Sequence, residues 1–167
     1  MPKTKDDLFQ RFEELGLQTR TITHPPLFTV EESQSLRGEI PGGHTKNLFL
    51  KDKKGRLFLV VALESASINL KHLHAKIGAT GRLSFGKPDL LMEKLGVVPG
   101  SVTPFGIIND ENRDVTLILD APMMDEDILN YHPLENTATT TIDREGLLAF
   151  IRSCGHEPTI LPVSDPE

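Results

Sequence analysis

The sequence has few of the residues that mark disulfide frameworks, metal clusters and membrane spans. It contains one cysteine, Cys154, one tyrosine and no tryptophan. A single cysteine allows no internal disulfide and no cysteine metal cluster, which agrees with a reducing compartment. No apolar run approaches the roughly 18 residues that a membrane-spanning helix needs, and the N-terminus lacks the apolar segment of a secretory signal. We therefore expect a cytoplasmic protein without a membrane partner.

The composition is nevertheless that of an ordinary globular chain. Hydrophobic residues make up 38% of the 167 residues and charged residues 25%, and the glycines and prolines are scattered rather than clustered. A chain of this length buries roughly two thirds of the surface that its unfolded form exposes. We expect one domain over residues 1–167, with a substantial core.

Positive charge is concentrated in the middle of the chain. The net charge is -6, yet residues 46–94 carry ten lysines and arginines against four acidic residues. Such a basic segment can form one face that attracts a polyanion on an otherwise repelling molecule. It can equally be a set of solvated loop and strand-edge charges that keep the protein soluble.

Helix and strand patterns are mixed without a regular alternation. Capped or amphipathic segments predict helices over residues 4–15, 30–36, 70–78, 87–96 and 144–155. Alternating or continuous apolar runs predict strands over residues 17–24, 47–52, 56–63, 114–120 and 137–143. The continuous run at 56–63 indicates a strand buried on both faces. These patterns predict an α+β fold, a single domain with a central mixed, largely antiparallel β-sheet or partial barrel wrapped by helices.

Common catalytic and cofactor signatures are missing from the sequence. There is no phosphate-binding GxxxxGK[ST] loop, no GxGxxG motif after a strand and no HExxH zinc motif. His72 and His74 are two residues apart on a predicted helix, so they point to different faces and make a poor metal site. Nothing near Cys154 in the sequence would lower the pKa of its thiol, which favours a buried structural role. We predict no metal and no cofactor.

Three segments remain as candidate sites. Lys46 and Asn47 follow the flexible pair Gly42 and Gly43 at the start of an apolar strand. A GxxxP loop over residues 100–104 could present consecutive backbone N–H groups to an anion or an oxyanion. The segment NYHPLENTATT supplies a histidine, an asparagine and several hydroxyls beside a predicted strand. Taken singly, each segment is weak evidence, because such residues more often serve turns and structural hydrogen bonds.

Together, and in this order, the segments GGHTKNLFLKDKKGRLFLVV, LGVVPGSVTPFGIIND and YHPLENTATTTI resemble the YbaK family of aminoacyl-tRNA deacylases. That family is related to the editing domain inserted in bacterial prolyl-tRNA synthetases. The likeness is greatest to its alanine-specific branch, the ProXp-ala (PrdX) proteins. The resemblance implies an enzyme that hydrolyses the ester of mischarged tRNA(Pro), most simply Ala-tRNA(Pro), with tRNA as partner, prolyl-tRNA synthetase as a candidate second partner, and no DNA.

The resemblance also assigns roles to residues. The family lysine corresponds to Lys46, which is expected to contact the phosphate or carbonyl end of the aminoacyl-adenosine, and the asparagine after it corresponds to Asn47. The expected carbonyl or oxyanion loop comprises Gly100, Ser101, Val102, Thr103 and Pro104. The family histidine and asparagine correspond to His132 and Asn136, expected to organise the substrate pocket.

Specificity and tRNA binding are expected to use further residues. A cavity that admits alanine but excludes proline needs apolar walls, for which the candidates are Ile22, Leu27, Phe28, Val30 and Leu129. The tRNA backbone would meet the basic residues Lys51, Lys53, Lys54 and Arg56.

Two alternatives stay open at this point. One is a cysteine-specific or broad-specificity deacylase of the same family. The other is a non-catalytic nucleic-acid-binding module, for which the chain has few aromatic residues to stack on bases.

Overall fold

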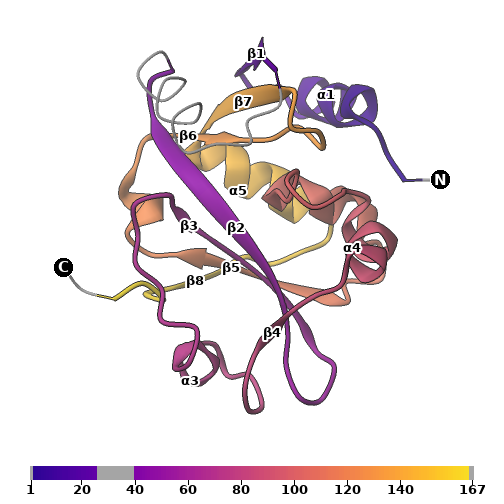
Figure 1. Ribbon diagram of the computed structural model, residues 1–167. Helices are drawn as coiled ribbons and strands as arrows, with labels where there is room; N and C mark the ends of the chain where they lie inside the picture. Colours follow the sequence, from indigo (N-terminus) through magenta and orange to yellow (C-terminus); the bar gives the residue numbers. More distant parts are fainter. Residues whose placement is uncertain (1, 26–39, 166–167) are drawn as a thin grey trace.

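The strands form one mixed sheet of eight strands, surrounded by helices (Figure 1). The structure is a computed structural model that describes residues 2–25 and 40–165. The strand order is β1-β7-β6-β2-β3-β5-β8, and β4 pairs with β2 beside this path. The strands are β1 (Thr19–Thr23), β2 (Gly43–Lys51), β3 (Leu57–Leu63), β4 (Ser84–Phe85), β5 (Val115–Asp120), β6 (Ile128–Tyr131), β7 (Ala138–Asp143) and β8 (Thr159–Leu161).

The long strand β2 joins the two halves of the sheet. Its start pairs in parallel with β6 at Gly43 and His44, whereas its remaining length pairs in antiparallel fashion with β3 and β4. Strand β5 then adds in parallel to β3, and β8 adds in parallel to β5. The predicted α+β class with a mixed central sheet is confirmed.

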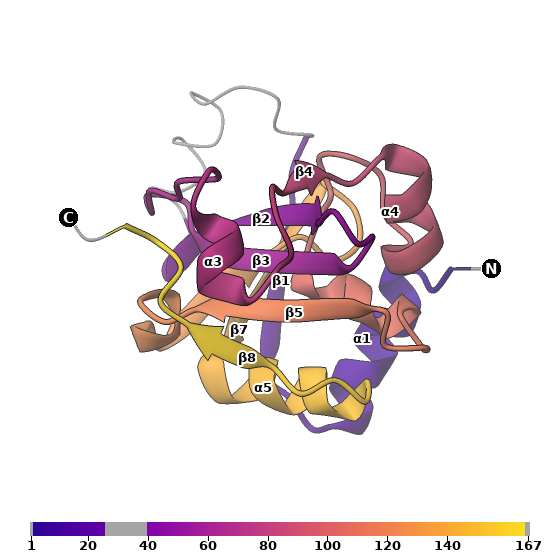
Figure 2. The same ribbon diagram turned by 90° about the horizontal axis from the view of Figure 1, so that it is seen from below.

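Helices cover the sheet and bury two apolar clusters. The α-helices are α1 (Lys5–Glu14), α3 (Leu73–Ile77), α4 (Pro88–Leu95) and α5 (Arg144–Ser153), with 3-10 helices η1 (Pro104–Asn109) and η2 (Met123–Asp125). The larger core takes side chains from α1, α4, α5 and η1, including Phe12, Phe105 and Phe150. The smaller core packs α3 against the other side of β3 and β5, and Figure 2 shows α3 and α5 on opposite sides of β5.

Local capping signals correctly predicted several helices. The Asp7 carboxylate accepts hydrogen bonds from the Thr4 N–H at 2.8 Å and from the Thr4 hydroxyl at 3.2 Å, so the expected capping box opens α1. Pro88 begins α4, and Gly96 ends it in the left-handed conformation. Both helices therefore begin and end where their own sequences specify.

Other predictions were incomplete. The helix expected over residues 70–78 is only α3, because Asn69 forms a turn in which its side chain accepts from the Lys71 N–H at 3.0 Å. Strands β4, β6 and β8 were not predicted, and β2 starts at Gly43 rather than Asn47. The helix expected over residues 30–36 lies outside the described residues. None of the helices in residues 2–25 and 40–165 has the length and apolar character needed to cross a bilayer.

Candidate functional site

The strands β1, β7 and β6 have one face that is not part of the larger core, and we call it the site face. The core lies on the other face, where Leu129 of β6 and its partner Ile142 of β7 are buried. Side chains alternate along a strand and paired residues share a face, so the pair Asn130 and Thr141 belongs to the site face. Ile22 of β1 pairs with the residue two positions before Thr141 and also lies on this face.

Lys46 and His132 extend the site face onto β2 and past the end of β6. His44 of β2 pairs with Asn130 of β6, and this is the last pair between the two strands. Lys46 and His132 each follow by two positions, so the alternation of side chains places both on the site face. Lys46 itself pairs on its other side with Ala62 of β3. The sheet is thus unpaired between the two strands at the level of Lys46.

The Lys46 ammonium group is held by a neutral oxygen. Its Nζ donates a hydrogen bond to the carbonyl of Ala66, in the loop after β3. Among the described residues, no carboxylate lies within ion-pair distance of Nζ, and the side chain is only partly buried. A lysine fixed in this way keeps its positive charge uncompensated, which suits it to bind an anionic or strongly polar group.

His132 is anchored as a neutral imidazole. Its Nδ1 lies 3.1 Å from the carbonyl oxygen of Ala138, so Nδ1 must carry the proton and Nε2 is left as an acceptor. Burial lowers the pKa of His132, the Ala138 carbonyl partly offsets this, and the neighbouring His24 lowers it further. The Nε2 of His24 in turn lies 2.8 Å from the Thr139 hydroxyl. His132 therefore offers a hydrogen-bond acceptor near pH 7 rather than a charge.

Asn130 holds the start of β2 in place, and sequence reasoning did not identify it. This buried side chain, 3% exposed, donates from Nδ2 to the carbonyls of Pro41 and Gly43 at 3.2 Å each. Its Oδ1 accepts from the Thr141 hydroxyl at 2.5 Å. Gly42 passes so close that a Cβ there would lie 2.8 Å from Ile128. The close approach that the two glycines allow therefore serves this clamp.

The loop over residues 100–104 has backbone amides that remain available. Ser101 donates its N–H to the Val98 carbonyl at 3.0 Å, and the Thr103 hydroxyl accepts from the Phe105 N–H at 3.3 Å. Within the described part of the chain, the N–H groups of Gly100 and Val102, which are not buried, donate no hydrogen bond, whereas Thr103 is fully buried. Pro104 follows as the first residue of η1. The loop is therefore anchored from within and can still donate to an external oxygen.

Asn136 lies beside this loop. A Cβ placed on Gly100, which has φ +92°, would be 3.6 Å from Nδ2 of Asn136. The segment from His132 to Asn136 thus spans from the site face to the 100–104 loop. The structure brings these two predicted segments together.

Two other predicted residues point away from the site face. Leu129 is fully buried in the larger core. Asn47 follows Lys46 directly, so its side chain is on the opposite face of β2, and its Oδ1 is buried without a hydrogen-bond partner among the described residues. The remaining predicted pocket residues, Leu27, Phe28 and Val30, lie outside the described residues.

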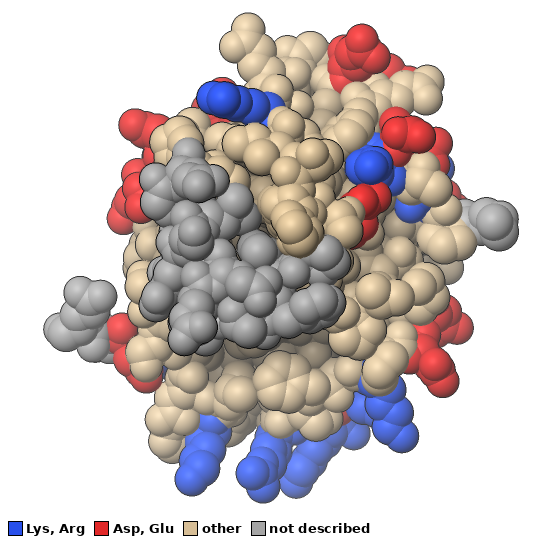
Figure 3. Space-filling model, turned by 45° about the horizontal axis from the view of Figure 1, so that its top comes forward, with Lys and Arg blue, Asp and Glu red and all other residues tan. Residues whose placement is uncertain are grey.

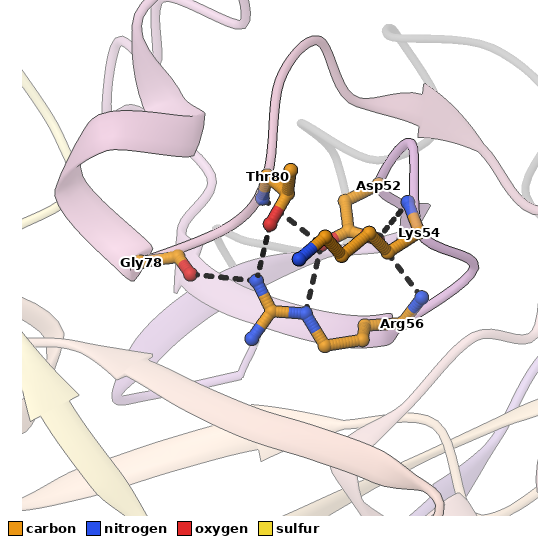
Figure 4. Close-up of polar contacts among 5 residues, drawn as sticks. All are labelled: Asp52, Lys54, Arg56, Gly78 and Thr80. Carbon is orange, nitrogen blue, oxygen red and sulfur yellow. Dashed lines mark hydrogen bonds and ion pairs between the residues drawn. The ribbon is translucent and has the colours of Figure 1, made fainter.

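The predicted tRNA-contact residues of the β2–β3 hairpin have different surroundings. Arg56 is bound into the structure, since its guanidinium donates to the buried Asp52 carboxylate at 3.0 Å and to the Gly78 carbonyl at 2.8 Å (Figure 4). Lys51, Lys53 and Lys54 have side chains that form no ion pair within the described ranges. Arg56 is therefore held in the fold by its own contacts, whereas Lys51, Lys53 and Lys54 have no ion pair among the described residues.

Asp52 organises the hairpin and the loop before β4. Burial by itself raises the pKa of Asp52, but hydrogen bonds from the N–H groups of Thr80, Arg56 and Lys54 and from the Arg56 side chain lower it to about 2. This carboxylate is therefore ionised at neutral pH, and it ties the loop around Thr80 to the hairpin.

Cys154 has the environment of a structural thiol. Burial raises its pKa, although contacts with Ser153 and Arg11 act in the opposite direction. A raised pKa disfavours the thiolate, which is the nucleophilic form. The structural role favoured by the sequence is consistent with this environment.

Comparisons with known proteins identify relatives over most of the chain. Residues 24–150 match the family model described as "Aminoacyl-tRNA editing domain". The mouse "Prolyl-tRNA synthetase associated domain-containing protein 1" is 36% identical over 159 residues, which is 93% of this chain and 94% of the relative. The "Prolyl-tRNA editing protein ProX" of Acetoanaerobium sticklandii is 36% identical over 153 residues, 91% of this chain and 93% of the relative.

Solved structures share the fold at lower sequence identity. One, described as "Crystal structure of a putative trans-editing enzyme for prolyl tRNA synthetase", has a TM-score of 0.70 and 19% identity, covering 99% of this chain and 100% of that one. A designed epitope scaffold has a TM-score of 0.74 and 17% identity, with both chains fully covered. At these identities the likeness supports the fold alone.

Proposed function

The chain belongs to the aminoacyl-tRNA editing domain family, and from this premise we propose that it hydrolyses the ester of mischarged tRNA(Pro), with Ala-tRNA(Pro) as substrate. The names of two relatives refer to prolyl-tRNA editing or to prolyl-tRNA synthetase, which supports tRNA(Pro) as the carrier. The single observation that carries the proposal is the cation Lys46, which has no ion pair among the described residues and lies on the same face as His132, where β2 and β6 separate.

The proposed reaction requires little from the protein beyond placement and electrostatics. An aminoacyl ester is already activated, so water can attack its carbonyl carbon once it is positioned and the developing oxyanion is stabilised. The N–H groups of Gly100 and Val102 are the proposed donors to that oxygen. The tetrahedral intermediate then breaks its bond to the ribose oxygen, releasing the amino acid and leaving a ribose hydroxyl.

Other residues are proposed to hold the two ends of the substrate. Lys46 supplies positive charge to the phosphate or carbonyl of the terminal aminoacyl-adenosine, and Asn47 supports this strand from its other face. The neutral His132 can accept a hydrogen bond from a ribose hydroxyl through Nε2, and Asn136 lies beside Gly100 of the oxyanion loop. A hydroxyl of the substrate ribose positions the water in this scheme, so no protein nucleophile is needed.

Specificity is proposed to come from the size of the amino-acid pocket. One methylene group changes binding by only about 1–3 kcal/mol, so steric exclusion protects correctly charged tRNA better than attraction alone. Among the described residues, Ile22 on the site face is the proposed wall of this pocket. Leu27, Phe28 and Val30, which lie outside the described residues, are its other proposed walls. A pocket just large enough for the alanine side chain excludes the larger ring of proline.

Single-turnover deacylation tests this proposal. Ala-tRNA(Pro) should be hydrolysed faster than Pro-tRNA(Pro), and Lys46→Ala should slow the reaction by about tenfold or more, which is at least about 1.4 kcal/mol of barrier. Lys46→Arg keeps the charge and controls for its loss. A Lys46→Ala variant that folds normally and deacylates within about twofold of wild type, about 0.4 kcal/mol, would remove Lys46 from the mechanism.

The same assay separates the alternatives. Faster release from Cys-tRNA(Pro) than from Ala-tRNA(Pro) would favour a cysteine-specific enzyme, and equal rates a broad-specificity one. Salt-sensitive tRNA binding without any ester hydrolysis would favour a binding module.

A further inference from the structure

A short segment after β8 lies against the loop that holds Lys46. We call residues 163–165 the strap and residues 65–69, between β3 and α3, the anchor loop. Figure 1 and Figure 2 both show the chain after β8 beside the connection from β3 to α3. The contact includes a hydrogen bond in which the Asp165 N–H donates to the Ser67 carbonyl at 2.7 Å. The strap therefore binds the anchor loop directly.

The anchor loop has few other backbone contacts. Its Ala66 carbonyl accepts a hydrogen bond from the Lys46 Nζ, and the Ala66 N–H closes a turn onto the Leu63 carbonyl at 3.0 Å. Within the part of the chain that the structure describes, Lys46 and the strap are the only distant groups that form hydrogen bonds with the backbone of this loop. The Ser67 carbonyl follows that of Ala66 by one residue. A contact that fixes the one therefore restricts the position of the other.

Asp120, at the end of β5, holds the start of the strap. This side chain is fully buried, and its Oδ1 accepts from the Val163 N–H at 2.8 Å and from the Ser164 N–H at 3.2 Å. Its Oδ2 is buried without a hydrogen-bond partner among the described residues. Burying a carboxylate is unfavourable unless hydrogen bonds compensate for the lost water. The two strap N–H groups supply that compensation, so Asp120 and the strap depend on each other.

The smaller core and α3 hold the rest of the strap. Val163 is fully buried in this core, and Ile68 of the anchor loop packs against the same cluster. The Lys76 Nζ, from α3, donates to the Val163 carbonyl at 3.4 Å and pairs with the Asp165 carboxylate at 3.1 Å. The strap is thus fixed by β5, by α3 and by apolar packing. Its Asp165 N–H is therefore held at a defined position beside the anchor loop.

We propose that Asp120 and the strap position Lys46 for its role at the site. Asp120 fixes the strap, and the Asp165 N–H of the strap fixes the Ser67 carbonyl. The adjacent Ala66 carbonyl then stays where the Lys46 Nζ meets it. The proposal rests on the function proposed above and names what regulates the position of its cation. Asp120 and Asp165 are positioning residues, because they act through Lys46.

The physical effect is preorganisation of a flexible side chain. Lysine carries its charge on a flexible four-carbon stem, and ordering that stem costs conformational entropy. A fixed Ala66 carbonyl selects one Lys46 conformation before the substrate arrives, so less ordering remains to be done on binding. A loose anchor loop would leave that conformation unselected. Small displacements of a group that acts on the reacting atoms lower the rate of a reaction strongly.

The first test compares two substitutions at Asp165. Asp165→Pro removes the N–H that donates to Ser67, whereas Asp165→Ala keeps this N–H and removes the carboxylate that pairs with Lys76. The position is partly exposed and lies outside the strands, so both variants should fold. At saturating Ala-tRNA(Pro), Asp165→Pro should lower the single-turnover rate by about threefold or more, the order expected for one lost hydrogen bond. Asp165→Ala should deacylate at close to the wild-type rate.

The second test needs no aminoacyl-tRNA. Trace acetylation with an N-hydroxysuccinimide ester, followed by mass spectrometry, measures the reactivity of each lysine. Lys46 should be acetylated about threefold faster or more in Asp165→Pro than in Asp165→Ala, because its Nζ leaves the carbonyl and becomes more exposed. Other lysines provide the internal standard, since basic side chains gather along the lower edge of the protein in Figure 3. The exposed Lys54 should react equally in all variants.

A conservative pair tests Asp120 with the same reagent. Asp120→Asn keeps an oxygen that accepts from the strap N–H groups, so Lys46 should be acetylated at the wild-type rate. Asp120→Ala leaves these N–H groups without their acceptor, and well below its Tm it should speed the acetylation of Lys46 as Asp165→Pro does. Because both residues act through the strap, the two substitutions combined should speed it no further than either alone.

The two readouts distinguish this proposal from the proposed function. Equal acetylation of Lys46 in Asp165→Pro and Asp165→Ala would overturn the positioning role of the strap, whatever the deacylase activity. Faster acetylation in Asp165→Pro with an unchanged deacylation rate would also overturn it, since Lys46 would then not need its fixed position. Faster acetylation in a protein that hydrolyses no aminoacyl ester would support the positioning of Lys46 and refute the enzyme.

Discussion

Replacing Asn130 should loosen the start of β2, where Lys46 is located. Its amide makes three hydrogen bonds, to Pro41, Gly43 and Thr141, of which the one to Gly43 is fully buried. At about 1 kcal/mol for each, Asn130→Ala should lower the free energy of unfolding by about 3 kcal/mol. For a domain of this size, that corresponds to a fall of about 6–12 °C in Tm.

Chemical denaturation measures this effect, and Thr45→Val provides a graded control. The Thr45 hydroxyl donates one hydrogen bond, to the Asn130 carbonyl at 2.6 Å, so its loss should cost about 1 kcal/mol. Asn130→Asp keeps the shape but turns a carboxylate toward two carbonyl oxygens, so it should be no better tolerated than alanine. If Asn130→Ala unfolds within about 0.5 kcal/mol of wild type, well below the cost of one such bond, the clamp does not hold the strand.

The clamp also makes a functional prediction. Because Lys46 is three residues beyond Gly43, a loosened β2 should slow single-turnover deacylation in folded Asn130→Ala well below its Tm. A variant that loses stability but deacylates at the wild-type rate would show that the clamp does not position Lys46, which its pairing with β3 and its hydrogen bond to Ala66 then hold.

Two further predictions concern ionisable groups. The pKa of Asp52 is lowered from 3.8 to about 2, so its contribution to the free energy of unfolding is fully present above the unfolded value and is lost as pH falls from about 4 to 2. Asp52→Asn should therefore flatten the profile of stability against pH in that window. An unchanged profile would contradict the hydrogen-bond assignment. Because burial raises the pKa of Cys154, its thiol should react with a disulfide reagent at pH 8 more slowly than a free cysteine does. Cys154→Ala should deacylate at the wild-type rate. Rapid labelling that abolishes activity, together with an inactive alanine variant, would point to a catalytic thiol.

The parts of the fold that sequence predicted are those determined by neighbouring residues. The capping box of Thr4 and Asp7 and the Pro88 to Gly96 boundaries of α4 depend on local contacts. Strands β4 and β8 are two and three residues long, and they become strands only because β2 and β5 pair with them. Short segments whose structure depends on distant partners carry no periodic signal of sufficient length.

The candidate site was predictable as a set of segments but not as a surface. The segments around Lys46, Gly100 and His132 were identified, yet their relation depends on the parallel pairing of β2 with β6, an unpredicted strand. Asn130 was missed for the same reason, because a polar residue in a short segment gives no sign of the carbonyls that it will meet. The separation of Lys46 from Asn47, by contrast, follows from the two-residue period of any strand.

The surroundings of the cations explain how one basic segment can serve several purposes. Arg56 is neutralised by Asp52, so its charge stabilises the hairpin and contributes little to attraction of a distant anion. Lys46 is bonded to a carbonyl and has no ion pair among the described residues, but it is fixed on a strand and exposed only in part. Lys51, Lys53 and Lys54 form no ion pair within the described ranges, so their charges stay available to a ligand. The hairpin lysines should therefore attract the RNA over a long range, and Lys46 should make a short-range, oriented contact with it. Raising the salt concentration should then weaken RNA binding more strongly than it slows hydrolysis of bound substrate.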